Sequence, residues 1–351
     1  MTVVFLYSEV MGYTLASLGA LAVNGSDVHV VHWDHRKLTP FRLPSDTGIT
    51  FYPRSQLSCS TASQLIEELK PDVLVISGWM DSAYLRIAAR YRSSGLTTVL
   101  ALDGQWEGRW RQRTMAALFR FGVRRALFSH AWVPGLPQYE YARKLGFSKS
   151  EIRGDLYSAD VDLWNRVYRS ARALRADRFP RRFVFVGRIE EVKGIRELLT
   201  AWAGIGDRQG WELHVIGEGS LASELRSLDG VVVHGFLQPA QLAEKFQTAG
   251  CLVLPSRREP WGVAIHEAAA SGLPLIVPDI AGAASAFLIE GLNGYLFEVG
   301  SSSSLRECIR KVITRSDDQL RRMSEASHAL AQRITPMTSA MNLLSVLSGK
   351  A

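Results

Sequence analysis

Cations, glycines and a carboxylate follow three apolar runs in the second half of the chain. Each run has the continuous apolar character of a buried parallel strand, and the carboxyl ends of parallel strands meet at one edge of a sheet. Two cations, glycines and a carboxylate therefore converge on one crevice at that edge, which is where open α/β sheets bind ligands. The residues are Gly187, Arg188 and Lys193 after Phe183–Val186, Gly217 after Leu213–Ile216, and Glu259 after Cys251–Leu254.

Two glutamates stand eight residues apart in different surroundings. Pro260 and Gly262 place Glu259 in a loop, whereas residues 263–270 have a helical composition, so Glu267 lies near a helix N-terminus. Eight helical residues rise by about 12 Å, which is enough to contact a sugar at one end and a ribose at the other. The helix start between the glutamates offers free N–H groups and a positive dipole end to a bridging diphosphate.

A second glycine pattern competes with this interpretation. Residues 217–222, GEGSLA, match the G-x-G-x-x-A fingerprint of dinucleotide-binding loops and lie between a strand and a helix. The next strand, Val231–Val233, is followed by His234 and Gly235 and not by an acidic residue for a ribose. The fingerprint also lies in the middle of a domain. An NAD-dependent oxidoreductase is therefore an alternative, and the absorbance of bound nucleotide would distinguish it.

Strand-like and helical segments alternate in two sets, which predicts two doubly wound α/β domains. We expect an N-terminal domain over residues 1–165, an Arg- and Ala-rich interdomain linker over 166–182, a C-terminal domain over 183–325, and a last helix at 326–351 that packs back on the N-terminal domain. The predicted strands are Val3–Tyr7, Val28–His32, Val73–Ser77 and Thr98–Leu102 in the first domain, and Phe183–Val186, Leu213–Ile216, Val231–Val233, Cys251–Leu254 and Pro274–Val277 in the second.

Composition and charge indicate where the protein acts and which partners it could attract. The 351 residues contain no run of the roughly 18 apolar residues that span a bilayer, and the first residues show no signal-peptide pattern. The three cysteines, Cys59, Cys251 and Cys308, lack metal-ligand spacing, which favours a reducing cytoplasm. The net charge is +7, and residues 1–150 hold 17 Lys and Arg against 11 Asp and Glu. This excess either serves solubility or attracts phosphates, an anionic membrane or nucleic acid.

The motifs of the second half resemble those of the retaining family-4 glycosyltransferases of GT-B fold, of the type that builds polysaccharides or glycolipids. EPWGVAIHE resembles their E-x7-E signature, and FVFVGRIEEVKGIRELLTA resembles their phosphate-binding segment. VIGEGS, VHGFLQPAQLAEKF and CLVLPSRREPWG occur in the family's order. The likeness is marked over residues 183–300 and weak over residues 1–150. It implies two Rossmann-like domains facing a central cleft, and transfer of a sugar from a nucleoside diphosphate donor to an acceptor hydroxyl.

The resemblance also implies a role for each matching residue. Arg188 and Lys193 would bind the diphosphate, and Glu267 would bond the ribose hydroxyls. Glu259 would hold hydroxyls of the transferred sugar. The other donor-binding residues would be the backbone N–H groups of Trp261, Gly262 and Val263, the glycines Gly187 and Gly217, the base-lining His234, Phe236 and Leu237, and Gly12 of the first domain.

Asp103 stands where the family often has a histidine, after the fourth strand of the first domain. The resemblance makes it a candidate catalytic residue near the reacting sugar. The alternative is a turn residue before Gly104.

The sequence predicts a reaction without metal or cofactor. No D-x-D motif stands in a suitable loop, because Asp160 and Asp162 lie in the predicted connection between domains. Arg188 and Lys193 could neutralise the leaving diphosphate in place of a divalent ion. We expect a glycan or lipid-linked acceptor and no nucleic-acid partner. A synthase acting on a soluble acceptor is one alternative, and a non-catalytic nucleotide-sugar-binding protein is another, which the complete set of charged residues disfavours.

A basic segment lies between Glu107 and Glu140, which enclose no other acidic residue. If Arg109–Phe128 is one helix, Arg109, Arg113, Arg120 and Arg124 fall within about 60° of one another, opposite Met115, Leu118, Phe119 and Ala126. The stripe predicts peripheral association with an anionic surface on the inner face of the cell membrane, or with the phosphates of a lipid-linked acceptor. The alternative is a surface helix packed on the sheet, with its arginines in water.

Overall fold

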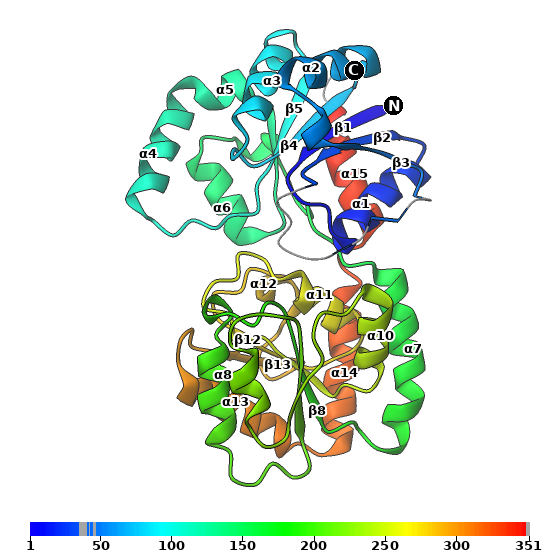
Figure 1. Ribbon diagram of the computed structural model, residues 1–351, viewed down its shortest axis with the longest axis vertical. Helices are drawn as coiled ribbons and strands as arrows, with labels where there is room; N and C mark the ends of the chain where they lie inside the picture. Colours follow the sequence, from blue (N-terminus) through cyan, green and yellow to red (C-terminus); the bar gives the residue numbers. More distant parts are fainter. Residues whose placement is uncertain (35–40, 42, 45–46, 349–351) are drawn as a thin grey trace. The chain divides into compact units, whose positions relative to one another are not determined.

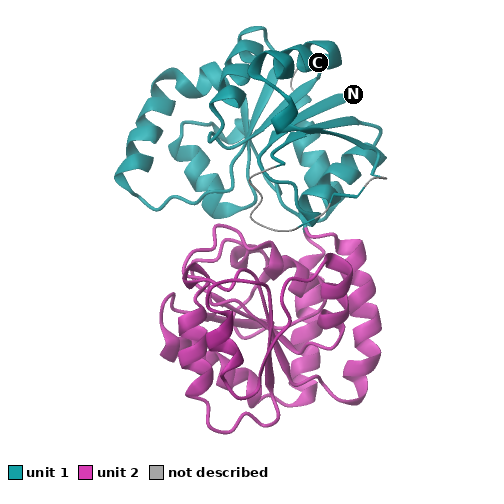
Figure 2. Cartoon of the chain, viewed as in Figure 1, with its two compact units in different colours: residues 1–158, 334–351 teal, residues 159–333 magenta. Residues whose placement is uncertain are grey.

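The chain folds into two compact units, each built on one parallel sheet. The structure is a computed structural model that describes residues 1–34, 41, 43–44 and 47–348. Unit 1 comprises residues 1–158 and 334–351, and unit 2 comprises residues 159–333 (Figure 2). Both sheets are doubly wound, as the alternation of apolar runs and helical segments predicts.

Unit 1 has a seven-stranded sheet in the order β3-β2-β1-β4-β5-β6-β7, with every pairing parallel. Its strands are β1 (Thr2–Tyr7), β2 (Asp27–His32), β3 (Ile49–Pro53), β4 (Val73–Ser77), β5 (Thr97–Ala101), β6 (His130–Trp132) and β7 (Ile152–Arg153). Its helices are α1 (Gly12–Val23), α2 (Cys59–Leu69), α3 (Ser82–Ser93), α4 (Trp110–Leu118), α5 (Arg124–Leu127), α6 (Leu136–Lys144) and α15 (Pro336–Leu344), with short turns η1 (Arg54–Gln56), η2 (Phe119–Val123), η3 (Lys149–Glu151) and η5 (Ser345–Leu347).

Both faces of this sheet are covered, which explains why its central strands are apolar throughout. Alternate residues of β1 enter opposite cores: Val4 and Leu6 pack with α2, α3 and α6, whereas Val3 and Phe5 pack with α1 and α15 (Figure 1). Because successive side chains of a strand point to opposite faces, a strand between two helical layers must be apolar at every position.

Unit 2 has a six-stranded parallel sheet in the order β10-β9-β8-β11-β12-β13. Helix α8 packs with α13, whereas α7, α11 and α14 pack together. The strands are β8 (Arg182–Val186), β9 (Glu212–Ile216), β10 (Val231–Val233), β11 (Cys251–Val253), β12 (Leu275–Pro278) and β13 (Gly294–Phe297). The helices are α7 (Val161–Asp177), α8 (Ile195–Ala203), α9 (Ala222–Arg226), α10 (Pro239–Gln247), α11 (Val263–Ala270), α12 (Ala284–Phe287), α13 (Ser302–Ile313) and α14 (Asp317–Ala331), with the turn η4 (Glu191–Lys193).

The structure corrects the expected linker. Residues 166–182 are no linker, because residues 161–177 form α7, which belongs to unit 2 and buries Trp164, Val167 and Ala171. The chain passes from unit 1 to unit 2 between residues 158 and 159, and returns to unit 1 between residues 333 and 334. The expected helix at 326–351 is two helices: α14 ends at Ala331 in unit 2, and α15 packs on α1 in unit 1.

The structure also corrects the expected long basic helix. The segment Arg109–Phe128 breaks at Phe121 and Gly122, where Gly122 has φ 129° within the π-helical turn η2. Arg124 does not belong to an exposed stripe, because its side chain is buried, donates to Glu151 Oε1 at 3.0 Å and lies 5.0 Å from the ring of Phe147. Leu118 and Ala126, expected on a packed face, are exposed.

Candidate donor-binding site

The site lies where the winding of the second sheet reverses. The chain runs from β8 outward to β9 and β10, then returns to place β11 on the other side of β8. The loops that follow β8 and β11 therefore leave the sheet side by side at its carboxyl edge, which is where open α/β sheets bind ligands. These two loops carry Arg188, Lys193 and Glu259.

Glycines allow these loops to touch. A Cβ atom on Gly194 would lie 1.8 Å from the carbonyl oxygen of Pro255, and one on Gly217 would lie 1.9 Å from that of Gly187. Both glycines have positive φ, +68° and +142°. The Gly187 N–H donates to Ile216 O at 3.0 Å. The loops after β8, β9 and β11 are thus fixed against one another by backbone contacts that no other residue type permits.

Lys193 and Glu259 form an ion pair in this arrangement. Lys193 Nζ lies 2.6 Å from Glu259 Oε2, and the Ser256 hydroxyl donates to the same oxygen at 2.8 Å. The two side chains are 20% and 10% exposed, so the pair is largely withdrawn from water. A Cβ atom at Gly187 would lie 3.9 Å from Lys193 Cε, which places the ammonium group beside the glycine of the β8 loop.

The start of α11 presents free donors beside Glu259. The N-cap of this helix is Gly262, with φ 96°, and a Cβ atom there would lie 2.9 Å from Glu259 Cγ. Within the described chain, the backbone N–H groups of Trp261, Gly262 and Val263 donate no hydrogen bond. Free N–H groups and the helix dipole make this position suitable for an anion or for sugar hydroxyls.

Glu267 lies further along α11. It keeps part of its surface exposed, yet the surrounding protein desolvates its carboxyl group, and this burial together with the nearby Asp160 raises its pKa to about 7. A carboxyl group held partly protonated near neutral pH gains from a hydroxyl partner that favours its charged form. Neighbouring His266 is structural: its Nδ1 accepts from the Ala159 N–H, its Nε2 contacts Ala331 O, and burial lowers its pKa to about 4.

Arg188 and residues 234–237, which the sequence predicts to line the base, are the remaining candidate donor-binding residues in unit 2. Arg188 is exposed and makes no ion pair with any described residue. His234, Phe236 and Leu237 are half-buried, and the adjoining Gly235 accepts the Gly217 N–H at 2.8 Å. The structure therefore brings the loops after β8, β9, β10 and β11 together.

Three contacts in these loops were not predicted from the sequence. Ser256 bonds Glu259, and Glu190 accepts from both the backbone N–H and the hydroxyl of Ser220, at 3.0 and 2.8 Å. Hydrogen bonding to Ser220 lowers the pKa of the Glu190 carboxyl group. Each serine precedes or follows a predicted residue by only a few positions, but only the fold shows which loops meet.

The dinucleotide fingerprint at 217–222 does not form an open cradle. A Cβ atom on Gly219 would lie 2.3 Å from Ile189 O, and Leu221 donates its N–H to that same oxygen. The helix that follows, α9, has five residues, and β9 lies one strand away from the reversal point. This loop is filled by the β8 loop, which argues against a pyrophosphate cradle of the oxidoreductase type.

Asp103 and Gly12 lie in unit 1, at the carboxyl edge of its sheet. Asp103 follows β5, is exposed, and accepts a hydrogen bond from the Tyr157 hydroxyl at 3.2 Å. The ring of Tyr157 packs edge-on against Tyr13, one residue after Gly12, with centroids 5.1 Å apart. Burial and the Asp103 charge raise the pKa of Tyr157 well above its usual range, so its hydroxyl stays a donor. Asp103 thus belongs to a defined polar cluster.

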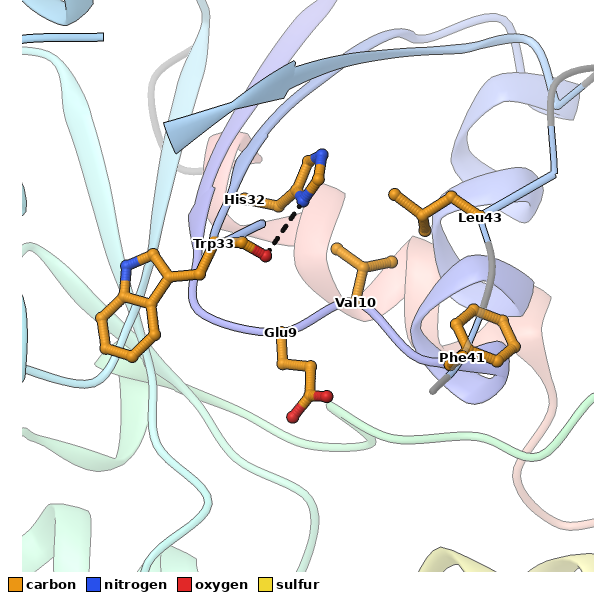
Figure 3. Close-up of a pocket in the computed structure, with 6 residues that line it drawn as sticks. All are labelled: Glu9, Val10, His32, Trp33, Phe41 and Leu43. Carbon is orange, nitrogen blue, oxygen red and sulfur yellow. Dashed lines mark hydrogen bonds between the residues drawn. The ribbon is translucent and has the colours of Figure 1, made fainter. Parts of the chain in front are cut away.

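A small pocket lies beside β1 and β2 in the same unit. Val10, Phe41 and Leu43 form one side of it, and Trp33 lies on the other, with Glu9 and His32 between them (Figure 3). His32 Nδ1 lies 3.2 Å from Trp33 O. No sequence motif pointed to this pocket, because its residues come from the end of β2 and from segments outside the helices and strands.

Two properties of the described residues concern metals and membranes. They contain no group of three or more His, Cys, Asp or Glu side chains placed to hold a metal ion. None of their helices combines the length and the apolar character needed to cross a bilayer.

Comparisons with known proteins show which family model and which relatives the chain resembles. Residues 170–329, which run from within α7 to within α14, match the family model of glycosyl transferases group 1. An uncharacterised glycosyltransferase of Methanocaldococcus jannaschii is 30% identical over 131 residues, which are 35% of this chain and 34% of that protein. Glycogen synthase of Mycobacterium tuberculosis is 30% identical over 164 residues, 44% of this chain and 38% of that protein. The chain thus spans little more than a third of the length of these curated relatives.

The fold as a whole is GT-B. The Anabaena protein HepE, solved in complex with UDP and glucose, superposes with a TM-score of 0.72 at 16% identity, over 99% of both chains. Two parallel-sheet, Rossmann-like units of the GT-B type are therefore the architecture of this protein, as the motif order had implied.

Proposed function

We propose that the protein is a retaining glycosyltransferase that moves a sugar from a nucleoside diphosphate donor to an acceptor hydroxyl, without a metal ion. The observation that carries the proposal is the Lys193–Glu259 pair at the reversal point of a sheet that matches group 1 glycosyltransferases. The ammonium group of Lys193 suits a diphosphate, and the carboxylate of Glu259 suits sugar hydroxyls. The pair would therefore lie where the bond between the sugar and the diphosphate breaks.

Each residue then has a step in the reaction. Lys193 and Arg188 bind the diphosphate and stabilise the negative charge that it gains as it leaves. Glu259 accepts hydrogen bonds from hydroxyls of the transferred sugar, and the free N–H groups of Trp261, Gly262 and Val263 donate to its oxygens. Glu267 binds the ribose. The acceptor hydroxyl attacks on the face from which the phosphate departs, its oxygen forms the new glycosidic bond, and its proton passes to the departing phosphate.

The acceptor that we propose is a polysaccharide or lipid-linked glycan precursor, with a soluble acceptor as the alternative. HepE was solved with UDP and glucose, and a lipopolysaccharide 1,6-galactosyltransferase of Escherichia coli is 29% identical over 143 residues. These names support a sugar nucleotide as donor and a glycan as acceptor. We further propose a location at or near the cytoplasmic face of the cell membrane.

The test of the reaction class is the anomeric configuration of the product in the presence of EDTA. A donor with an α-linked sugar should yield an α-linked product, read from the proton–proton coupling of the anomeric position by NMR, at an unchanged rate with chelator. A β-linked product, or a loss of activity that magnesium or manganese restores, would contradict the proposed mechanism.

Nucleotide binding should depend on pH through Glu267. Because its folded-state pKa, about 7, lies above the ordinary 4.5, the folded protein holds an extra proton between these values, and the group's contribution to the free energy of unfolding falls as pH rises through that window. Ribose hydroxyls favour the charged carboxylate, so the affinity for a sugar nucleotide should rise from about pH 6 to about pH 8. Calorimetric titrations at intervals of about one pH unit measure this rise.

Two variants test whether Glu267 causes this pH dependence of nucleotide binding. Glu267→Gln should flatten the pH dependence, and Glu267→Ala should weaken nucleotide binding by ~1.5–3 kcal/mol, the range for a hydrogen bond to a charged group. Equal affinities of Glu267→Ala and the unaltered protein would remove Glu267 from the site.

Asp103→Asn should impair transfer more than nucleotide binding. Asp103 lies in unit 1, so its loss should leave the donor-binding loops intact while kcat/KM falls by about tenfold, as for one hydrogen bond to a charged group. Tyr157→Phe, which removes the hydroxyl that holds Asp103, should act in the same direction but less. Tyr139→Phe, at a half-buried tyrosine of the same unit, is the control. Near-normal transfer by Asp103→Asn would leave Asp103 as a turn residue.

A further inference from the structure

Helix α4 in unit 1 is short and weakly packed. It has nine residues and buries only Ala116 completely, and it lies at the periphery of unit 1 (Figure 1). Trp110 and Leu118, at its two ends, are 69% and 55% exposed. Helices of this length are marginal in water and normally depend on a packed apolar face for stability. The exposed apolar side chains of α4 are therefore available to a partner surface.

The turn after α4 contains Phe121, the most exposed of the large hydrophobic side chains in the part of the chain that the structure describes. Phe121 is 91% exposed at the break formed with Gly122, and Val123 beside it is 39% exposed. Isolated exposed apolar residues are common on soluble proteins, but four large ones within 14 positions, residues 110–123, form a local concentration. The break projects Phe121 away from the core that Phe119 enters.

Arginines surround these apolar side chains. Arg109, Arg111, Arg113, Arg120 and Arg125 are exposed, and residues 108–139 contain no Asp or Glu. Arg109 is paired with Glu107 at 2.6 Å. The guanidinium carbon of Arg111 lies 5.3 Å from the centre of the Trp110 ring, which couples a cation to an exposed aromatic side chain. We name the exposed side chains of residues 109–125 the arginine arm.

This combination fits an anionic lipid bilayer. Arginines are attracted to anionic headgroups, tryptophan favours the headgroup region, and exposed apolar side chains gain by leaving water for the acyl boundary. Single-stranded nucleic acid would also attract arginines and stack on aromatic rings. It offers nothing to the aliphatic side chains of Leu118 and Val123, so the bilayer is favoured.

We propose that the arginine arm docks the protein on an anionic bilayer, with Phe121 and Leu118 inserted at the headgroup level and Arg113, Arg120 and Arg125 against the phosphates. The inference replaces the continuous basic stripe with a broken helix, omits Arg124, and assigns the apolar contact to Phe121 and to Leu118, of which the single helix would bury Leu118. It does not depend on the proposed transferase reaction, because docking is measured without donor or acceptor.

The experiment is co-sedimentation of the full chain with vesicles of phosphatidylcholine alone and of phosphatidylcholine mixed with phosphatidylglycerol, at low and high salt. We expect binding to the mixed vesicles only, weakened by salt. Arg113→Glu with Arg120→Glu should weaken it by at least about tenfold, since each basic group contributes ~1 kcal/mol near such a surface. Phe121→Ser with Leu118→Ser should weaken it by about tenfold while keeping the charge, because apolar burial is lost.

The matched control uses exposed apolar and basic side chains of α7 and of its C-cap residue Arg178 in unit 2, as Leu174→Ser and as Arg172→Glu with Arg178→Glu. These variants should bind the mixed vesicles like the unaltered protein. Circular dichroism melts should show that all variants fold. The proposal is overturned if the unaltered chain does not bind the mixed vesicles at low salt, if arm and α7 variants bind alike, or if the arm variants lose affinity for single-stranded RNA but not for vesicles.

Discussion

Replacing Lys193 by alanine is expected to lower kcat/KM for sugar transfer by about 100-fold or more, the usual loss when one preorganised donor to a developing charge is removed. The side chain of Lys193 lies beside Gly187, and its Nζ atom is 2.6 Å from Glu259 Oε2, in a largely enclosed position where a charge acts more strongly than in water. Arg188→Ala should cause a loss of similar size, because the two cations share the charge of the leaving diphosphate.

The measurement for both variants is initial-rate kinetics over a range of donor concentrations. Exposed cations away from the site serve as controls: Lys149→Ala in η3 for the lysine and Arg226→Ala in α9 for the arginine. Both controls should retain near-normal rates. A Lys193→Ala enzyme with a normal kcat and a raised KM would show that Lys193 binds donor and transition state equally, and would contradict its role with the leaving group.

Glu259→Gln is expected to lower kcat by about 100-fold while nucleoside diphosphate binding is retained or strengthened. The substitution keeps the shape of the side chain but removes the acceptor charge that holds the sugar hydroxyls. It also frees Lys193, whose ammonium group is then left largely enclosed without a carboxylate partner. A bound diphosphate replaces that partner, so the free diphosphate should raise the melting temperature of this variant at least as much as that of the unaltered protein.

The same titrations with the sugar nucleotide complete the test. Glu259→Gln should bind the sugar nucleotide no more tightly than the free diphosphate, because the affinity that the sugar contributes is lost. If Glu259→Gln instead weakens free diphosphate and sugar nucleotide equally, Glu259 serves the phosphates, and the division of roles between the two members of the pair is wrong.

The sequence predicted the central strands of both sheets and the edge strand β10, and missed the edge strands β3, β7 and β13 and the short strand β6. Continuous apolar runs identified β1, β2, β4 and β5, because helices cover both faces of these strands. Strands β6 and β7 have three and two residues, too few to show a period, and β3 is an edge strand that is half-exposed.

Helix α7 was taken for a linker because its arginines hide its pattern. Its buried positions, Val161, Trp164, Val167, Ala171 and Arg175, have helical spacing, but one of them is itself an arginine. Arg175 is buried without a carboxylate partner among the described residues, and it donates instead to Ser271 O, Gly272 O and the Ser324 hydroxyl. A composition-based reading treats such a segment as solvated, and only the tertiary partners show otherwise.

The candidate site was more predictable than its supporting contacts. Parallel strands place their carboxyl ends at one edge, so the spacing alone was enough to predict that Lys193 and Glu259 share a loop cluster. The Ser256 and Ser220 bonds depend on how loops fold against one another, which no local pattern reports. The burial of Arg124 likewise depends on Glu151, 27 residues later. Side chains whose partners are distant in sequence were the main source of error.

The central claim is that the loops after β8, β9, β10 and β11 bind a nucleoside diphosphate, and a thermal-shift screen with UDP, GDP, ADP, dTDP and NAD tests it most directly. A ligand present at 100 times its dissociation constant stabilises the folded state by about 2.7 kcal/mol. We predict that one of the four diphosphates raises the melting temperature by several degrees, and that Glu267→Ala reduces the shift. A shift with NAD and with none of the diphosphates, or no shift with any of them, would contradict the claim.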